Sequence, residues 1–312
     1  MTSQVSVCGL RIAVDVRGSG QPVLLINGLG GSLGLWEPLR RDLADLEVIS
    51  FDAPGAGRST TPRNVYSMSD LARFVTRLLD TLGYDTVDVV GHSFGGALAQ
   101  QLAHQAPDRI RRIVLATTTC GWGGVPGTLG SAFTALTPFR LWSKRVYRLT
   151  IPLLAGGRHN DEAELLRAWA GERLSKRPSF GGYSKQLLAG WTWSSLPWLT
   201  TIEHPVLVVA GSDDRLLPLA NSQILAMRLP NARMLVFEGH GHYLLLDQRS
   251  GASAAIGDFI RSSDLNESQT WRTAHVVSPD DLDDSLRSQN RWSPIAMPHT
   301  LVRRRWQSTA RY

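Results

Sequence analysis

Short runs of apolar residues alternate with segments of helical periodicity along the first 120 residues of the chain. A short apolar run bounded by turn residues is typical of a strand that is covered on both faces. Strands are predicted in this way at 23–26, 48–51, 87–90 and 113–116, and helices between them at 35–43, 68–82 and 97–104. Residues 4–17 alternate enough to predict an antiparallel hairpin that turns near Gly9. Because strand and helix alternate, we expect an α/β fold with a mostly parallel, doubly wound sheet.

The alternation stops at Gly121 and resumes with the apolar run at 205–211. The residues between, 121–201, have helical periodicity and are rich in tryptophan, tyrosine and phenylalanine. A helical insertion between two strands predicts a lid over the carboxyl ends of the strands, where open α/β sheets bind ligands. We therefore expect residues 1–120 and 202–262 to form the core of the fold and residues 121–201 to form the lid.

The chain after residue 262 carries charge without an apolar pattern. Residues 280–284 are acidic around a single leucine, and residues 303–305 are arginines. Charged segments of this kind bury little apolar surface. We predict that residues 263–312 form a disordered tail outside the fold.

Composition and charge narrow the function classes. With 43% hydrophobic and 19% charged residues, the chain has the balance of an ordinary globular protein. The net charge of +6 comes from scattered arginines, so we expect no nucleic-acid partner. Two distant cysteines, Cys8 and Cys120, match no metal spacing and indicate a reducing compartment. Since we find neither a signal-peptide pattern nor an apolar stretch long enough to span a bilayer, we expect a cytoplasmic protein without membrane insertion.

The strongest chemical signal is the segment VVGHSFGG at residues 89–96. It places Gly-x-Ser-x-Gly between a predicted strand and a predicted helix, which is the pattern of a nucleophile elbow. Gly91 and Gly95 would let the two backbones pass closely while Ser93 adopts a strained conformation with its hydroxyl exposed. The context favours a nucleophilic serine over a merely structural turn, and the side chain of His92 is expected to turn away from Ser93.

A serine nucleophile needs a base, and the base needs an acid that orients it. The acid is expected after the strand that follows the lid, where Asp213 and Asp214 are neighbours. We favour Asp214 and interpret Asp213 as a turn residue. The base is expected after the next strand, where we favour His242 over His240 because His242 opens the apolar segment that leads to the last helix.

Acyl transfer also needs N–H donors for the oxyanion. We expect one from the backbone of Phe94, just after the nucleophile, and one from Leu29 in the loop that begins at Asn27 and Gly28. This glycine-rich loop has neither the Gly-x-Gly-x-x-Gly pattern nor a following lysine, so it does not predict a dinucleotide or phosphate site. Asp52, which begins the next turn after a strand, is expected to cap local N–H groups.

These residues in this order make residues 4–262 resemble the α/β-hydrolase superfamily. Four further segments resemble the intracellular depolymerases of medium-chain-length poly(3-hydroxyalkanoate). They are LLINGLG at 24–30, FDAPGAG at 51–57, LLAGWTW at 187–193 and LPNA at 229–232. The lid segment is the most telling, since lids vary most among these enzymes. The resemblance places Ser93, Asp214 and His242 on the family's triad positions, although the segment around His242 is one residue longer than the family pattern.

The resemblance implies hydrolysis of the esters of a storage polyester by a Ser-His-Asp mechanism that needs no metal or organic cofactor. It implies that Asn27, Gly28, Trp191 and Trp193 contact the substrate, and that the partner is a polyester granule or an apolar ester. Other serine hydrolases, such as a carboxylesterase, a lipase or a carbon–carbon bond hydrolase, would use the same triad. A non-catalytic binding protein on the same scaffold is a further alternative, against which the intact triad argues.

Overall fold

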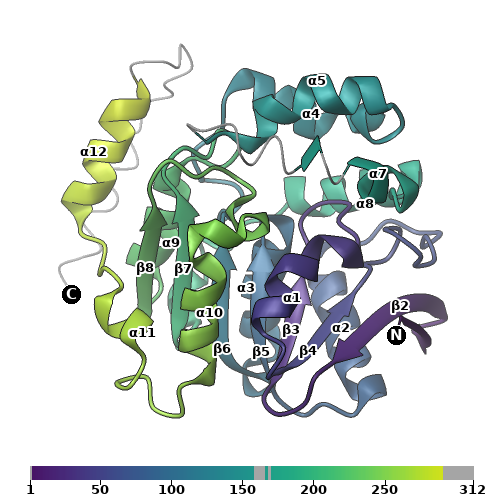
Figure 1. The fold of residues 1–312 in the computed structure, drawn as a ribbon, viewed down its shortest axis with the longest axis horizontal. Helices are drawn as coiled ribbons and strands as arrows, with labels where there is room; N and C mark the ends of the chain where they lie inside the picture. The colour runs from purple at the N-terminus through teal and green to yellow at the C-terminus, as the bar shows by residue number, and fades with distance from the viewer. Residues whose placement is uncertain (1, 158–165, 168–169, 291–312) are drawn as a thin grey trace.

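The computed structural model describes residues 2–157, 166–167 and 170–290, and its centre is an eight-stranded sheet. The strands are β1 (Ser3–Val7), β2 (Leu10–Arg17), β3 (Pro22–Ile26), β4 (Glu47–Phe51), β5 (Val87–His92), β6 (Ile110–Ala116), β7 (Val206–Gly211) and β8 (Ala232–Phe237). Their order in the sheet is β1-β2-β4-β3-β5-β6-β7-β8. The hairpin β1–β2 is antiparallel and joins β4 antiparallel, whereas β3 to β8 are all parallel. The mostly parallel α/β sheet expected from the sequence is thus confirmed (Figure 1).

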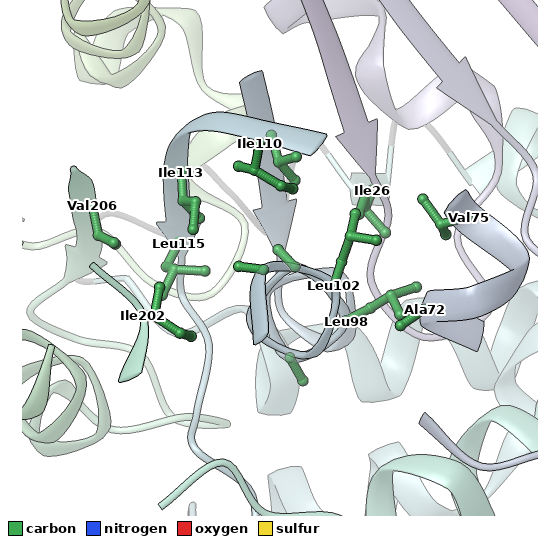
Figure 2. Packing of buried hydrophobic residues seen from close by; sticks show 14 of the residues in the cluster. Ile26, Ala72, Val75, Leu98, Leu102, Ile110, Ile113, Leu115, Ile202 and Val206 are labelled. Carbon is green, nitrogen blue, oxygen red and sulfur yellow. The ribbon is translucent and has the colours of Figure 1, made fainter. Parts of the chain in front are cut away.

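Helices cover both faces of the sheet. One face packs against α2 (Met68–Leu82), α3 (Phe94–Gln105) and α9 (Leu219–Arg228), and the other against α1 (Glu37–Asp42) and α10 (Ala252–Arg261). In Figure 2, Leu98 and Leu102 of α3 lie beside Ala72 and Val75 of α2 and close to Ile26 of β3. Each leucine buried in this way contributes roughly 1.5–3 kcal/mol of transfer free energy. This packing fixes α3, and hence its first residue, against the sheet.

The chain between β6 and β7 crosses the carboxyl ends of the strands as a layer of helices (Figure 1). The helices are α4 (Leu129–Leu136), η3 (Pro138–Leu141), α5 (Lys144–Ala155), α7 (Ala170–Ser175) and α8 (Phe180–Trp191). They share a small core of their own, in which Tyr147, Ile151 and Leu154 of α5 pack with Tyr183 of α8. Other lid aromatics are exposed to solvent, among them Phe133, Phe139, Trp142 and Phe180.

The prediction of a disordered tail from residue 263 is wrong for residues 263–290. These residues form α11 (Gln269–Thr273) and α12 (Pro279–Asn290). Trp271 stacks on Phe259 of α10 at 5.4 Å between ring centroids, and the segment after it pairs with the edge strand β8 through a bridge between Met234 and His275. Buried apolar side chains without a regular spacing, such as Trp271 and Ala274, hold the segment on the sheet together with hydrogen bonds such as that from the N–H of Thr270 to Asp258. Residues 291–312, the rest of the predicted tail, lie outside the described residues.

No helix in the described part of the chain is both long enough and apolar enough to cross a bilayer.

Candidate active site

Ser93 lies between β5 and α3, at the turn that the motif predicts. Its backbone has φ 55° and ψ −119°, a strained conformation for a residue with a side chain, which costs about 1–3 kcal/mol. The glycines on either side allow the turn, because a Cβ on Gly91 would lie 2.5 Å from the carbonyl oxygen of Gly95, and a Cβ on Gly95 would lie 2.0 Å from that of Ile26. The first turn of α3 therefore presses against β3 with Ser93 at its end.

Ser93, His242 and Asp214 form one hydrogen-bonded chain. His242 Nδ1 lies 2.8 Å from Asp214 Oδ2, and His242 Nε2 lies 3.0 Å from Ser93 Oγ. Since the carboxylate accepts, Nδ1 carries the proton in the neutral ring, and Nε2 is left with a lone pair that faces the serine hydroxyl. The arrangement can therefore remove a proton from Ser93.

Asp214 is held for this task by its own loop after β7. Its Oδ1 accepts hydrogen bonds from the backbone N–H groups of Leu216 at 2.8 Å and Leu217 at 2.9 Å, which leaves Oδ2 for His242. Asp214 is 7% exposed, whereas the neighbouring Asp213 is half-buried and bonds through its backbone to His240. Of the two aspartates, the structure brings Asp214 to the histidine.

The two candidate histidines have different surroundings. His242 is 2% exposed and lies in the chain just described. The side chain of His240 is 26% exposed, with Nδ1 3.2 Å from the carbonyl oxygen of Glu238 and Nε2 3.8 Å from Asp247 Oδ2. Of the two, only His242 lies within hydrogen-bond distance of Ser93.

The backbone of His242 is fixed from both the core and the lid. Its N–H donates to the carbonyl oxygen of Ala155, the last residue of lid helix α5, at 2.6 Å. Its carbonyl oxygen accepts from His92 Nε2 at 2.9 Å and from Thr117 Oγ1 at 3.1 Å. His92 therefore helps to fix the backbone of His242, a role that the sequence did not indicate. The lid also fixes the position of His242, through Ala155.

The loop expected to supply an oxyanion donor lies directly against the nucleophile. A Cβ on Gly28 would lie 3.3 Å from Ser93 Cβ, and Gly28, Leu29, Ser93 and Phe94 line one cavity. Phe94 is the first residue of α3, where backbone N–H groups have no acceptor within the helix and the helix dipole favours negative charge.

The far end of this loop is anchored by Asp52. Its Oδ1 accepts the N–H of Leu33 and its Oδ2 the N–H of Arg58, both at 2.8 Å. Burial raises the pKa of this carboxyl, and the two N–H donors oppose the shift. Asp52 therefore caps N–H groups as expected, and in doing so it also holds the oxyanion loop in place.

The cavity beside Ser93 has a volume of about 250 Å³ and a mostly apolar wall. Its wall includes Leu154, Leu187, Leu216 and Leu217. Trp191 and Trp193 also line it: Trp191 is 54% exposed, whereas Trp193 is buried and donates Nε1–H to Gln101 at 2.7 Å. The described residues contain no group of three or more His, Cys, Asp or Glu side chains that could hold a metal ion.

Residues 21–248 match the family model described as the alpha/beta hydrolase fold. The chain belongs to this family. It is 41% identical over 244 residues to a poly(3-hydroxyalkanoate) depolymerase from Ectopseudomonas oleovorans, an alignment that covers 77% of this chain and 84% of that protein. It is 28% identical over 271 residues to the 2-hydroxymuconate semialdehyde hydrolase of Pseudomonas sp. strain CF600, covering 84% of this chain and 94% of the relative.

Solved structures agree with the fold of this α/β hydrolase. A meta-cleavage product hydrolase from Pseudomonas fluorescens IP01 superposes with a TM-score of 0.73 at 23% identity, covering 84% of this chain and 98% of that one. An esterase from Exiguobacterium antarcticum gives a TM-score of 0.73 at 21% identity, covering 84% and 100%. Together with the family match and the 41% identical relative, the findings show that the protein is a hydrolase that acts on esters.

Asn27 of this α/β hydrolase does not lie where the sequence led us to expect. Its side chain is buried behind the loop and donates to the carbonyl oxygen of Ser32 at 3.1 Å. The residues that line the catalytic cavity include Gly28 and Leu29 but not Asn27. Because its amide bonds within its own loop, Asn27 stabilises the turn of the loop.

Two polar residues of the lid line the cavity of the α/β hydrolase and escaped the sequence reasoning. Gln186 of α8 is buried; its Oε1 accepts the N–H of Gly30 at 2.8 Å and its Nε2 donates to the carbonyl oxygen of Pro54 at 3.2 Å. Arg140 of η3 is also buried. The sequence signal was limited to a polar residue in each of two apolar segments. The partners of Gln186, which are Gly30 and Pro54, are remote in the chain.

Proposed function

We propose that the protein hydrolyses the ester bonds of poly(3-hydroxyalkanoate) with medium-length alkyl side chains, or of its oligomers, by a serine acyl-enzyme mechanism. The observation that carries the proposal is the hydrogen-bonded chain of Ser93, His242 and Asp214 at an apolar cavity beneath a helical lid. The depolymerase that is 41% identical to this chain supports the choice of polymer. The site of action would be a storage granule inside the cell.

The reaction follows from the geometry of the site. Ser93 Oγ attacks the ester carbonyl carbon while its proton passes to His242 Nε2, and the carboxylate of Asp214 stabilises the imidazolium. The backbone N–H groups of Leu29 and Phe94 stabilise the oxyanion of the tetrahedral intermediate. The intermediate expels the hydroxyl group of the adjoining monomer, which takes the proton from His242. Water then attacks the acyl-enzyme by the same route and releases the carboxylic acid and free Ser93.

A medium-length alkyl side chain suits the wall of the cavity. Leu154 and Leu187 from the lid and Leu216 and Leu217 from the core surround the space beside Ser93. Apolar transfer contributes about 0.8 kcal/mol for each methylene group that leaves water. Gly28 and Trp193 would contact the substrate near the scissile bond, and Trp191 would contact it at the mouth of the cavity.

The first test is the turbidity of a suspension of medium-chain polyhydroxyalkanoate granules after the purified protein is added. We expect clearing with the wild type and none with Ser93→Ala, while hydrolysis of p-nitrophenyl octanoate reports the state of the site in parallel. Hydrolysis of the soluble ester without clearing would contradict the polyester function and assign the site to a small apolar ester. Failure of a fluorophosphonate probe to label Ser93 would contradict any serine hydrolase function.

We also propose that the exposed side of the lid contacts the granule. The lid outer face consists of the exposed apolar side chains of α4, η3 and α5, which are Leu129, Phe133, Leu136, Phe139, Trp142, Val146, Leu149 and Leu153. Those from α4 and α5 follow a helical spacing, so each helix presents one stripe to solvent. Exposed apolar stripes on two neighbouring helices are typical of a contact site.

The double variant Phe133→Ser/Leu149→Ser is expected to weaken binding to granules at least about tenfold, because each side chain is 70% exposed in the free protein and its apolar contact with the granule would be lost. Co-sedimentation with granules measures the binding. Val65→Ser, which removes a 66% exposed side chain far along the chain from the lid, is the matched control. Equal binding of both variants and the wild type would contradict the proposal, and an unchanged rate on p-nitrophenyl octanoate would confirm that the site itself is intact.

A further inference from the structure

Arg140 is a buried cation in the wall of the catalytic cavity. It belongs to the short helix η3, between lid helices α4 and α5, and is 6% exposed. It lines the same cavity as Ser93 and His242, whose wall is otherwise mostly apolar. The acyl-transfer mechanism does not use this side chain.

Among the described residues, the hydrogen-bond partners of Arg140 are neutral groups. Nη1 donates to the carbonyl oxygens of Thr134 and Thr137, the latter at 3.1 Å, and Nη2 donates to the hydroxyl of Tyr183 at 3.1 Å. These are neutral acceptors, and they occupy three of the five N–H donors of a guanidinium. In the part of the chain that the structure describes, no carboxylate pairs with Arg140, whereas the equally buried Arg40 pairs with Asp15 at 2.7 Å.

Arg140 is connected to the oxyanion loop through one aromatic ring. Its guanidinium carbon lies 5.7 Å from the centroid of the Tyr183 ring. That ring also contacts the loop, since a Cβ on Gly30 would lie 2.9 Å from Tyr183 Cδ2. The cation and the oxyanion loop thus contact the same aromatic ring in the wall of the catalytic cavity.

We propose that Arg140 binds a carboxylate of the substrate, namely the free carboxyl end of a hydroxyacid chain whose ester is held at Ser93. A cation that pairs with no carboxylate of the described residues is costly to bury in an apolar wall, and a substrate carboxylate that accepts two parallel hydrogen bonds offsets that cost. In a polyester of 3-hydroxyacids, the monomers inside the chain and the hydroxyl end are uncharged, and the carboxyl end is the charged group. The inference rests on the proposed function and deepens it: the enzyme prefers chain ends and short oligomers with a free carboxylate.

A purely structural role for Arg140 makes a different prediction. Thr134 and Thr137 lie at the carboxyl end of α4, where a cation stabilises the last carbonyl groups. If that were the whole role, removal of the guanidinium would loosen the lid and slow all substrates alike. The test must therefore compare charged and uncharged substrates that are otherwise the same.

The substrates are the linear dimer of 3-hydroxyoctanoic acid and its methyl ester, in which the internal ester is the bond to be cleaved. For the wild type we expect kcat/KM on the free acid to exceed that on the methyl ester roughly 10- to 100-fold. Arg140→Met should remove this preference, mainly through an increase in KM for the free acid. Arg140→Lys should keep part of it, because lysine retains the positive charge but cannot donate two parallel hydrogen bonds to a carboxylate. Arg148→Met, which changes an exposed arginine of α5, is the matched control and should leave the preference unchanged.

Three results would separate the possible failures. Equal wild-type rates on acid and methyl ester would overturn the inference while leaving the polyester function in place. A uniform loss in Arg140→Met, on both dimers and on p-nitrophenyl octanoate, would show that Arg140 serves only to cap α4. Cleavage of neither dimer by a wild type that hydrolyses p-nitrophenyl octanoate would contradict the polyester function itself.

A second measurement needs no variant. 3-Hydroxyoctanoate and methyl 3-hydroxyoctanoate can be compared as inhibitors of p-nitrophenyl octanoate hydrolysis by the wild type. We expect the acid to inhibit competitively at a concentration about tenfold lower than the ester. The opposite order, which an apolar cavity alone would give, overturns the inference.

Discussion

Alanine at Ser93 or at His242 is expected to lower kcat for p-nitrophenyl octanoate by about 10⁴-fold or more. Ser93 Oγ supplies the new bond to the acyl carbon, and His242 Nε2, 3.0 Å away, takes its proton. Because the two groups act in the same step, the double variant should be no slower than the slower single variant. Steady-state kinetics on the soluble ester measure the loss, and circular dichroism shows whether each variant is folded.

His240→Ala is the matched control for the assignment of the base. It removes the same type of side chain two residues away, from a position that is 26% exposed and outside the hydrogen-bonded chain. We expect its kcat to remain within about twofold to threefold of the wild type, as is usual for a substitution away from the reacting groups. A large loss in His240→Ala together with a small one in His242→Ala would reverse the assignment. Additive losses in Ser93→Ala/His242→Ala would show that the two residues do not act as a unit.

The sequence was sufficient for the parts of the site that are attached to strands. Ser93, Asp214 and His242 each follow a strand of the parallel sheet, and the carboxyl ends of parallel strands meet at one edge. Their meeting therefore follows from the topology alone. The choice of Asp214 over Asp213 depended on spacing, and the structure explains it by the backbone N–H groups that hold one carboxylate oxygen of Asp214.

The sequence could not predict contacts between segments that are far apart in the chain and have no motif in common. Gln186 reaches Gly30, 156 residues away in the chain, and Ala155 of the lid accepts the N–H of His242. The same limit explains the wrong prediction for residues 263–290. Trp271 packs on Phe259 of α10, but the charged residues around it show no regular spacing of apolar positions. Asn27 was expected to contact the substrate because of the loop in which it lies, whereas the structure shows that its amide bonds within that loop and does not line the cavity.

Gly95→Ala is expected to lower the free energy of unfolding by about 4 kcal/mol or more, a large part of the roughly 5–15 kcal/mol that stabilises a typical domain. The added Cβ would lie 2.0 Å from the carbonyl oxygen of Ile26 and 2.7 Å from that of Asn27. Both atoms belong to the backbone of β3 and the start of the oxyanion loop, so no side-chain rotation can relieve the overlap. Urea denaturation followed by tryptophan fluorescence, or the yield of soluble protein where the variant does not accumulate, measures the loss.

Gly171→Ala is the control, since the new Cβ in α7 would meet no atom of the described residues within 4 Å and alanine favours a helix over glycine by about 0.5–1 kcal/mol. A Gly95→Ala protein with wild-type stability would contradict the tight crossing of α3 and β3.

If the Gly95→Ala variant folds with reduced stability, relief of the overlap requires α3 to move away from β3. Ser93 and the N–H of Phe94 lie at the start of α3, whereas Leu29 lies in the loop that follows β3. The same movement therefore separates the nucleophile from one side of the oxyanion site. We therefore expect the folded fraction of Gly95→Ala to lose activity on p-nitrophenyl octanoate, in contrast to Gly171→Ala.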